Sequence, residues 1–336
     1  MVTIKDVARR AGVSLGTVSN VINRPEVVSA QNRALVLAAI EELGYVRSEG
    51  ARQLRAGRSR IVGLLVLDMA NPFFVEVARG AEHVSRAAGL RVMVCNSGQD
   101  AREEAEYLSL FVEQRVRGVL VTPADISGRN LDAFVQRGVP FVFVDRVVPQ
   151  ARACSVSVDD VTGGTLAATH LLETGHTELV FVNGPTHLAQ CADRLAGVRN
   201  AIAAAGLPDT ALTVLPVDRL DVSSGRDAGA RLLGLRHRPT AVFCANDLLA
   251  LGVLQTVFGA GVRVPQDMAI VGYDDIEFAA AAAVPLSSVR QPAYRIGATA
   301  AELLIDETGE NSDNHRHQRV VFQPELVVRR SSMPTR

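Results

Sequence analysis

Residues 3–23, TIKDVARRAGVSLGTVSNVIN, contain two short helical patterns separated by a glycine. Thr3 can cap the first helix, since its side chain can accept a hydrogen bond from the first turn. Gly12 suits a tight turn that needs a positive φ, and Ser14 can cap a second helix over about residues 15–23. Two short helices joined by such a turn form a helix-turn-helix.

A third helix is expected after this pair. Ser29 can cap it, and Gly44 can end it. The spacing of its apolar residues predicts an inward face made of Leu35, Ala38, Ala39 and Leu43.

The outward face of the second helix carries short or uncharged side chains, and no acidic residue lies between Asp6 and Glu26. A solvated face normally carries Glu, Lys and Arg, whereas a face that enters a DNA groove cannot carry acids beside phosphates. The first sixty residues hold ten basic and five acidic side chains, although the whole chain has a net charge of −1. This basic end on an acidic body indicates a DNA-binding head joined to a different module.

Length and composition exclude several classes of protein. The 336 residues suggest two or three domains, and 48% of them are hydrophobic, enough for a sizeable core. Lys5 is the single lysine, which excludes a P-loop, Schiff-base chemistry and the protein-kinase strand lysine. The motifs HExxH and GxGxxG do not occur, and the GxSxG match GVSLG at residues 12–16 lies in the turn of the helix pair, where no strand precedes it as in a hydrolase. We therefore expect a protein that is not an enzyme and needs no cofactor.

The cysteines and histidines show no metal-binding spacing. The four cysteines lie far apart without a CxxC pair, and we expect them to be buried as small hydrophobic residues. His315 and His317 lie in a polar stretch, where we expect them to be solvated, so no metal site is predicted. The sequence shows neither an apolar leader nor a run of 18 apolar residues, and we expect a cytoplasmic protein with no membrane partner.

From residue 61 onward, short apolar runs alternate with helical stretches. The runs IVGLLVLD, RVMVC, GVLVT and PFVFVD come first, and LVFVNG, TAVFCAN and MAIVGYDD follow. Apolar strands separated by helices predict parallel sheets covered on both faces. The two sets of strands therefore predict two similar α/β lobes.

Polar residues end several of these strands, where open α/β sheets bind their ligands. They are Asp68, Thr122, Asp145-Arg146, Asn246-Asp247 and Asp274-Asp275. Together with Arg194, such carboxylates and amides suit a neutral polyhydroxylated ligand, and Phe73 and Phe74 could contact the apolar face of a sugar. Each residue also has a plainer alternative, since it could cap a helix, form a turn, or lie in the core or on the surface.

The chain resembles the LacI-type (lactose repressor) family of bacterial transcription regulators over nearly its whole length. The resemblance rests on TIKDVARRAGVSLGTVSNVIN, ELGY, ARQLRAGRS, NPFF, RLAG, VFCANDLLALG and VGYDD, in this order. It implies an α/β protein with a helix-turn-helix head over residues 1–46 and a hinge over 47–60. Residues 61–336 would form a core of two lobes resembling the periplasmic binding proteins.

The resemblance also implies the contacts with DNA. The base-reading residues of the second helix would be Leu15, Gly16 and Asn20, and Gly16 departs from the family pattern, which leaves the operator sequence open. The phosphate-binding residues would be Thr3, Ser14, Thr17, Ser19, Asn23, Ser29 and Asn32. Leu54 of the hinge would wedge into the minor groove beside Arg52 and Arg55. The partners would be double-stranded, pseudo-palindromic operator DNA and a second copy of the chain, as a homodimer.

The effector-binding residues that the resemblance implies are Phe73, Asp145, Arg194, Asn246, Asp274 and Gln291. Leu220 stands where relatives often carry a stacking aromatic residue. Leu188 and Gln190 stand where the purine-sensing members carry Arg and Thr, so we expect a pentose, hexose or small glycoside in place of a purine corepressor. We expect the effector to release the protein from DNA. The alternatives are a regulator controlled by a phosphocarrier protein and an activator or corepressor-dependent regulator.

Overall fold

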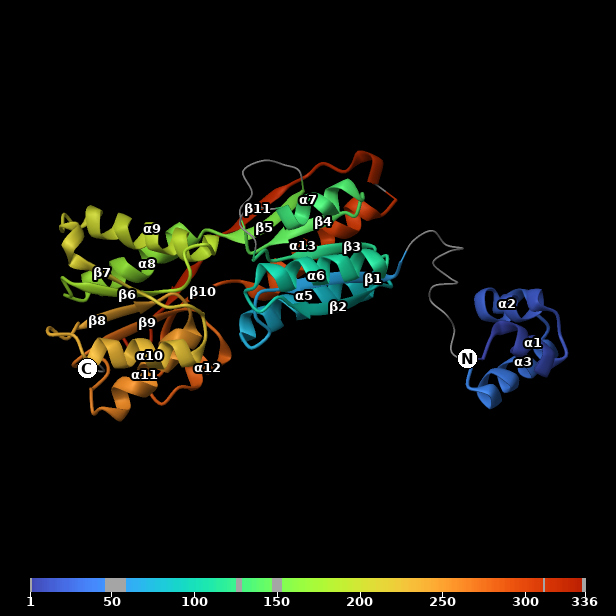
Figure 1. Cartoon of the computed structure of the whole chain (residues 1–336), viewed down its shortest axis with the longest axis horizontal. Coiled ribbons are helices and arrows are strands. Elements are labelled where there is room, and N and C mark those ends of the chain that lie inside the picture. Colours follow the sequence, from blue (N-terminus) through green and yellow to red (C-terminus); the bar gives the residue numbers. More distant parts are fainter. Residues whose placement is uncertain (1, 46–58, 125–128, 147–152, 311, 334–336) are drawn as a thin grey trace. The chain divides into compact units, whose positions relative to one another are not determined.

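The computed structural model describes residues 2–45, 59–124, 129–146, 153–310 and 312–333. The chain divides into two compact units, Met1–Arg58 and Ser59–Arg336, and each is described by itself. Figure 1 labels most of the helices and strands of both.

The first unit holds a helix-turn-helix followed by a third helix. Its elements are α1 (Ile4–Ala11), α2 (Leu15–Asn23), the 3₁₀ turn η1 (Pro25–Val27) and α3 (Ala30–Leu43). Ser14 Oγ accepts a hydrogen bond from the Thr17 amide at 3.1 Å, which caps α2 as predicted. Gly12 adopts a φ of 67° in the turn, a conformation that glycine reaches without steric cost. The predicted caps at Ser14 and Ser29 and the Gly12 turn are therefore confirmed, whereas the Thr3 hydroxyl donates to Asp6 and accepts no bond from the first turn.

The predicted inward face of α3 is correct at Ala39 and Leu43 and wrong at Leu35 and Ala38. Val36 and Ala39 are buried, whereas Leu35 is 46% exposed and Ala38 is also exposed. The run ALVLAAI offers two neighbouring apolar stripes along a helix, so periodicity alone cannot choose between them. Packing against α1 and α2 selects the stripe that contains Val36.

The second unit consists of two α/β lobes, as predicted (Figure 1). In the first lobe, the six-stranded sheet has the order β11-β5-β4-β3-β1-β2, and all its strands are parallel. The strands are β1 (Ile61–Val66), β2 (Arg91–Asn96), β3 (Gly118–Val121), β4 (Phe141–Val144), β5 (Cys154–Val158) and β11 (Arg319–Phe322). The helices of this lobe are α5 (Pro72–Ala87), α6 (Ala101–Glu113), α7 (Arg129–Gln136) and α13 (Ala293–Thr308).

The second lobe repeats this architecture with the sheet order β12-β10-β9-β8-β6-β7. Its strands are β6 (Leu179–Asn183), β7 (Leu212–Pro216), β8 (Ala241–Cys244), β9 (Ala269–Asp274), β10 (Ser287–Arg290) and β12 (Glu325–Val327), and β12 runs antiparallel to β10. The helices are α8 (Asp160–Glu173), α9 (Ala189–Ala204), α10 (Val222–Leu233), α11 (Asp247–Gly259) and α12 (Glu277–Ala281). The 3₁₀ turn η2 (Asp209–Ala211) precedes β7, and η3 (Ser312–Asn314) lies between α13 and β11.

The chain passes between the lobes three times. The crossovers follow β5, β10 and β11, so each begins at the carboxyl end of a strand. The amide of Asp159 in the first crossover donates to the carbonyl of Phe322 at the end of β11, at 3.0 Å. The three connections therefore lie at the edge of the sheets where ligands of α/β folds bind.

Glycines let three helix pairs pack with their backbones in contact. A Cβ on Gly297 of α13 would overlap the Val77 carbonyl of α5, and a Cβ on Gly80 would overlap the Tyr294 carbonyl in return. The pairs α8–α9 and α10–α11 show the same reciprocal contact at other glycines. Larger residues at these positions would force the helices apart.

In the described ranges, every helix is too short or too polar to cross a membrane.

Candidate functional site

The outward face of α2 presents the residues expected to meet bases. Leu15 is 45% exposed, and Gly16 and Asn20 are also exposed. No residue of α2 is charged, so this face forms no ion pair that would compete with contacts to DNA. Two acids elsewhere in the unit are paired with arginines, Glu42 with Arg10 at 2.6 Å and Asp6 with Arg9 at 3.4 Å. The helix therefore offers an uncharged surface that can approach a polyanion.

The residues expected to bind phosphates lie at helix starts and along α2. The Thr3 hydroxyl donates to the Asp6 carboxylate at 2.7 Å, and the Ser29 hydroxyl accepts from the Asn32 amide at 3.3 Å. The Asn23 side chain donates to the Ser19 carbonyl at 2.8 Å. The remaining two, Ser14 and Thr17, share a hydroxyl–hydroxyl bond of 2.9 Å. Their roles toward DNA stay predictions, and Arg52, Leu54 and Arg55 lie outside the described residues.

A second candidate site is a narrow cavity between the two lobes of the core. Five of the six expected effector residues line it: Phe73, Asp145, Arg194, Asn246 and Asp274. The lining also includes Leu67, Asp68, Asn71, Phe74, Gln99, Gln190 and Leu220. The cavity measures about 30 Å³, and a single water needs roughly 10–15 Å³ on this scale. A sugar can therefore enter only when the lobes move apart.

Gln291 lies beside this cavity. Its side-chain amide donates to Asp274 Oδ1 at 2.7 Å, and the residue lines a neighbouring cavity of about 620 Å³ between α5, α12 and the start of α13. The structure thus places Gln291 behind the Asp274 carboxylate.

Two hydrogen bonds join the lobes across the narrow cavity. The Asn71 side chain of the first lobe donates to Asp274 Oδ2 of the second at 2.8 Å. In the opposite direction, Gln190 of α9 donates to Asp145 Oδ2 at 3.0 Å. A hydrogen bond to a carboxylate contributes about 1.5–3 kcal/mol, and one to a neutral carboxyl group contributes about 0.5–1.5 kcal/mol. These two contacts therefore favour the closed arrangement.

Arg194 is held by the protein at several points. Its Nε donates to Asp160 Oδ1 at 2.8 Å, its Nη1 donates to the Ala245 carbonyl at 2.6 Å, and its guanidinium lies 3.7 Å from the centre of the Tyr273 ring. The side chain is only 3% exposed. Burial lowers the pKa of Arg194, but the Asp160 carboxylate outweighs it and raises that pKa well above the ordinary value. Arg194 is therefore a fixed positive charge at the floor of the cavity.

The two facing carboxyl groups have raised pKa values. Burial, reinforced by repulsion from Asp160, raises the pKa of Asp145 to about 8, against the opposing effect of Arg194. Burial also raises the pKa of Asp274 to about 6, where Arg194, Asn71 and Gln291 oppose it. Near neutral pH Asp145 is therefore mainly protonated, whereas Asp274 is mainly ionised.

Unsatisfied polar atoms point to a missing partner. Among the described residues, Asp145 Oδ1 and Gln291 Oε1 are buried without a hydrogen-bond partner. Asp145 and Asp274 also adopt positive φ angles of 57° and 105°. Such strained positions cost of order 1–3 kcal/mol and concentrate at functional sites.

Other residues that line the cavity also make structural contacts within the core. Phe73 and Phe74 pack edge to face with ring centres 5.0 Å apart, and both are buried although they line the cavity. Asn246 caps α11 by accepting from the Leu249 amide at 2.9 Å, so the capping alternative also holds. Leu188, by contrast, is a buried residue before α9 and is absent from the lining.

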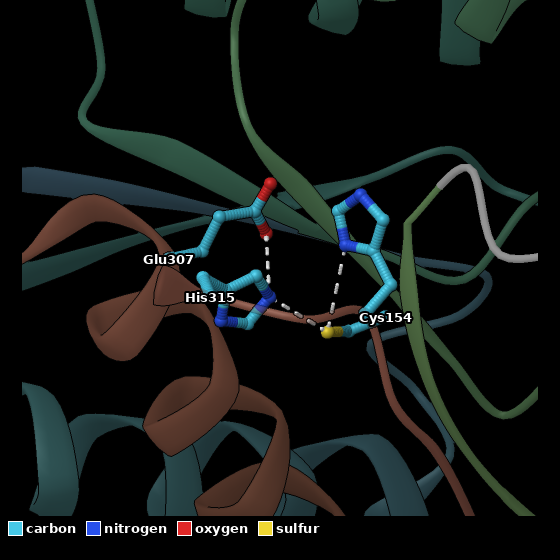
Figure 2. Close-up of side chains that lie close together, drawn as sticks. Cys154, Glu307 and His315 are labelled. Carbon is cyan, nitrogen blue, oxygen red and sulfur yellow. Dashed lines mark hydrogen bonds and ion pairs between the residues drawn. The ribbon is translucent and has the colours of Figure 1, made fainter. Parts of the chain in front are cut away.

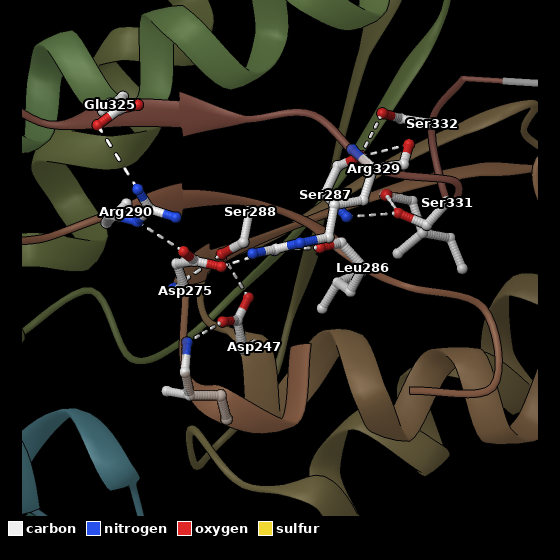
Figure 3. Close-up of polar contacts among 12 residues, drawn as sticks. Asp247, Asp275, Leu286, Ser287, Ser288, Arg290, Glu325, Arg329, Ser331 and Ser332 are labelled. Atoms are coloured by element: carbon white, nitrogen blue, oxygen red, sulfur yellow. Dashed lines mark hydrogen bonds and ion pairs between the residues drawn. The ribbon is translucent and has the colours of Figure 1, made fainter. Parts of the chain in front are cut away.

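The neighbouring aspartates are structural. Asp247 Oδ1 accepts from Ser288 Oγ at 2.7 Å, and its Oδ2 accepts from the Ile276 amide at 2.9 Å. Figure 3 shows Asp275 between Arg290 and Arg329, which donate to it at 2.7 and 2.6 Å. These contacts stabilise the end of β9, so of the pair Asp274-Asp275 only Asp274 reaches the narrow cavity.

Sequence reasoning missed Asn71 and Gln99 in the cavity. Asn71 caps α5 by accepting from the Phe73 amide at 3.0 Å, and its place before Pro72 could have marked it as a strand-to-helix residue. Another error concerns His315, which the sequence analysis placed in solvent and whose side chain is 4% exposed. The Nε2 atom of His315 lies 3.3 Å from Cys154 Sγ.

Comparisons with known proteins cover both units. The family model for bacterial regulatory proteins of the lacI family matches residues 3–48, and the model for a periplasmic binding protein-like domain matches residues 168–332. The HTH-type transcriptional repressor PurR of Photobacterium profundum is 36% identical over 334 residues, which cover 98% of each chain. The repressor of the same name from Vibrio cholerae is 35% identical over 332 residues, 98% of this chain and 97% of the relative.

The chain belongs to the LacI family of bacterial regulatory proteins.

Solved structures of LacI-family proteins agree with this assignment. A complex of the transcriptional regulator CelR with cellobiose is 33% identical, with a TM-score of 0.73 and coverage of 99% of this chain and all of that one. The lac repressor dimer bound to operator and the anti-inducer ONPF is 27% identical, with a TM-score of 0.82 and 99% coverage of both chains. A LacI-family regulator from Enterococcus faecium with bound ribose is 28% identical, with a TM-score of 0.75, over 82% of this chain and all of that one.

The family identifies this protein as a DNA-binding transcription regulator with a ligand-binding core. LacI-family repressors bind operator DNA and small-molecule effectors and act as dimers. The predicted resemblance and fold class are thereby confirmed.

Proposed function

We propose that this LacI-family protein is a homodimeric repressor whose affinity for a pseudo-palindromic operator changes when a sugar or small glycoside binds between the lobes of its core. The observation that carries the effector class is the pair of buried carboxyl groups, Asp145 and Asp274. They face one cavity from opposite lobes, beside the fixed charge of Arg194.

The protonation states of this pair suit hydroxyl groups. At neutral pH a protonated Asp145, with its pKa of about 8, can donate as well as accept a hydrogen bond, whereas Asp274 mainly accepts. A sugar hydroxyl also donates and accepts, so vicinal hydroxyls can pair with both carboxyl groups and with Arg194. The CelR–cellobiose and ribose-bound relatives support a saccharide in this fold. The residues proposed to bind it are Phe73, Asp145, Arg194, Asn246 and Asp274, with Gln291 positioning Asp274.

Coupling to DNA would follow from the closed geometry. A sugar that enters the cavity must break or replace the hydrogen bonds of Asn71 and Gln190 across the lobes. The lobes would then rotate relative to each other about the three crossovers. Because binding linkage is reciprocal, operator DNA must change sugar affinity by the same factor. We expect the sugar to lower operator affinity.

The DNA-binding part of the proposal assigns the head to residues 1–46, the hinge to 47–60 and the core to 61–336. Leu15, Gly16 and Asn20 would meet base edges, with Asn20 able to pair bidentately with adenine. A single head reads few bases, so two copies on a pseudo-palindrome would supply specificity. Arg52, Leu54 and Arg55 would contact the minor groove.

Isothermal titration of the full chain with pentoses, hexoses and disaccharides tests the effector. We expect one class to bind, to change operator affinity in a gel-shift assay, and to lose at least tenfold in affinity in Asp145→Asn. Asp227→Asn is the matched control, because Asp227 is exposed on α10. Heat from a purine base or a phosphocarrier protein, and none from any saccharide, would refute the sugar assignment.

A second experiment tests the head. Asn20→Ala should weaken binding to a selected operator by about 5–150-fold, which corresponds to roughly 1–3 kcal/mol for a bidentate base contact. Binding to unrelated DNA should change little. Equal losses on both DNAs would remove Asn20 from base reading, and a sedimentation profile of monomers at operator-binding concentrations would refute the dimer.

A further inference from the structure

Four side chains with metal-binding atoms meet in the first lobe of the core. The Cys154 Sγ, one Glu307 carboxylate oxygen, and one ring nitrogen each of His315 and His317 all lie within 4.8 Å of one another. Cys154 Sγ is 3.3 Å from His315 Nε2 and 3.9 Å from His317 Nδ1. His315 Nε2 is also 3.9 Å from Glu307 Oε2. Figure 2 shows the labelled side chains of Cys154, Glu307 and His315 converging on one point.

Strand pairing creates this cluster from distant parts of the sequence. Cys154 begins β5, Glu307 lies in the last turn of α13, and both histidines lie in the segment that leads to β11. Parallel pairing of β11 with β5 places Arg319 opposite Ser155, which brings the preceding segment to the start of β5. The cluster therefore lies at the amino end of its strand, away from the cavity at the carboxyl ends.

The surrounding groups orient the ligand atoms. His315 Nδ1 lies 2.7 Å from Asp306 Oδ2, so the ring donates its Nδ1 proton to that carboxylate and turns the lone pair of Nε2 toward Cys154. Histidines that bind metals commonly have such a carboxylate behind them. The amide of Gln318 donates to Cys154 Sγ at 3.3 Å, a contact that favours a thiolate. The cluster thus has an outer layer of hydrogen bonds in addition to four ligand atoms.

The geometry points to a Zn²⁺ site formed by Cys154, Glu307, His315 and His317. One thiolate, two imidazoles and one carboxylate form the ligand set of a borderline-soft, tetrahedral cation. With Zn–S of about 2.3 Å and Zn–N of about 2.0–2.1 Å, a tetrahedral site holds sulfur and nitrogen about 3.6 Å apart. The observed sulfur–nitrogen distances of 3.3 and 3.9 Å bracket this value. Movements of a few tenths of an ångström would bring these two pairs to that spacing, and the Glu307 carboxylate, 3.9 Å from His315 Nε2, would move farther to join them.

The charge and access of the site also fit a cation. A thiolate from Cys154 and a carboxylate from Glu307 would bring two negative charges to the site, and a divalent cation offsets both. His317 is exposed, which leaves a path from solvent. A bound ion would hold β5, α13 and β11 together. Each of these elements belongs to the first lobe and adjoins one of the three connections between the lobes.

Metal analysis of the full chain tests this proposal. Protein freed of metal by a chelator, dialysed against Zn²⁺ and then against buffer should retain one zinc per chain. Cys154→Ser and His317→Ala should each retain far less, while His237→Ala, a change at an exposed histidine between α10 and β8, should retain one. Because His317 is exposed, His317→Ala keeps the test valid if Cys154→Ser fails to fold, and circular dichroism checks the fold.

Cobalt provides a second readout. Co²⁺ in this site should give visible ligand-field bands of a tetrahedral ion and a sulfur-to-cobalt charge-transfer band that Cys154→Ser removes and Cys95→Ser leaves. Wild-type protein that retains no zinc, or zinc that survives both Cys154→Ser and His317→Ala, overturns the proposal. The cluster would then be a hydrogen-bonded network, in which the thiol donates to His315.

Discussion

Replacement of Arg194 by methionine should destabilise the core more than any loss of surface charge. The change removes hydrogen bonds to Asp160 and to the Ala245 carbonyl, which contribute about 1.5–3 kcal/mol each, and a ring contact with Tyr273. It also leaves Asp160 buried without its counter-charge. Breaking a buried pair in this way costs about 3–5 kcal/mol. At roughly 2–4 °C per kcal/mol for a domain of this size, the melting temperature should fall by about 6–20 °C.

Urea unfolding of the full chain, followed by far-ultraviolet circular dichroism, measures this loss. Arg199→Met is the matched control, because Arg199 is an exposed residue of the same helix, and it should change stability by less than about 0.5 kcal/mol. The double variant Arg194→Met with Asp160→Asn should lose less than the sum of the single variants, since neither then leaves a buried charge alone. A loss below about 1 kcal/mol in Arg194→Met, or strict additivity, would refute the reasoning.

Three further predictions concern pH, helix packing and the cap of α2. Because the folded pKa of Asp145 is about 8, above its ordinary value of 3.8, the folded state binds this proton more tightly. The free energy of unfolding should therefore fall as pH rises from 4 to 8, by up to about 1.4 kcal/mol per pH unit. In urea titrations of Asp145→Asn, the free energy of unfolding should fall less steeply between pH 6 and 8 than in the wild type. Asp274, with its pKa of about 6, contributes little in this range. An unchanged slope would contradict this prediction. Gly297→Ala should cost at least about 1–3 kcal/mol in urea unfolding through backbone overlap, whereas Gly259→Ala, which meets open space, should cost nothing; equal effects would rule out the packing argument. Ser14→Ala should cost about 1 kcal/mol of cap energy and speed amide exchange in α2 but not in α13, and unchanged exchange in α2 would show that the cap is dispensable.

Local sequence predicted the head well because its structure depends on short-range interactions. Ser14 accepts a hydrogen bond three residues away, and Gly12 provides the φ that the turn needs. The inward face of α3 was the exception. Two adjacent apolar stripes satisfy the same periodicity, and only contact with the other helices excludes Leu35 from the core.

The strand ends of the core were predicted because apolar runs mark buried parallel strands. The pattern could not separate Asp274 from Asp275, which are adjacent in sequence but point to different partners. Asp274 meets Asn71 of the other lobe, whereas Asp275 pairs with Arg290 and Arg329. This distinction depends on side-chain direction at the end of a twisted strand, and a list of residues does not contain it.

The sequence by itself therefore determined what nearest neighbours along the chain decide: the helix-turn-helix, the alternation of strands and helices, and polar residues at the strand ends. Only the tertiary structure decided which distant groups meet. The contact of Gln190 with Asp145 spans 45 residues, and that of Cys154 with His315 spans 161. Such contacts form when strand order and helix packing place the two segments side by side, and neither segment carries a local signal of its partner.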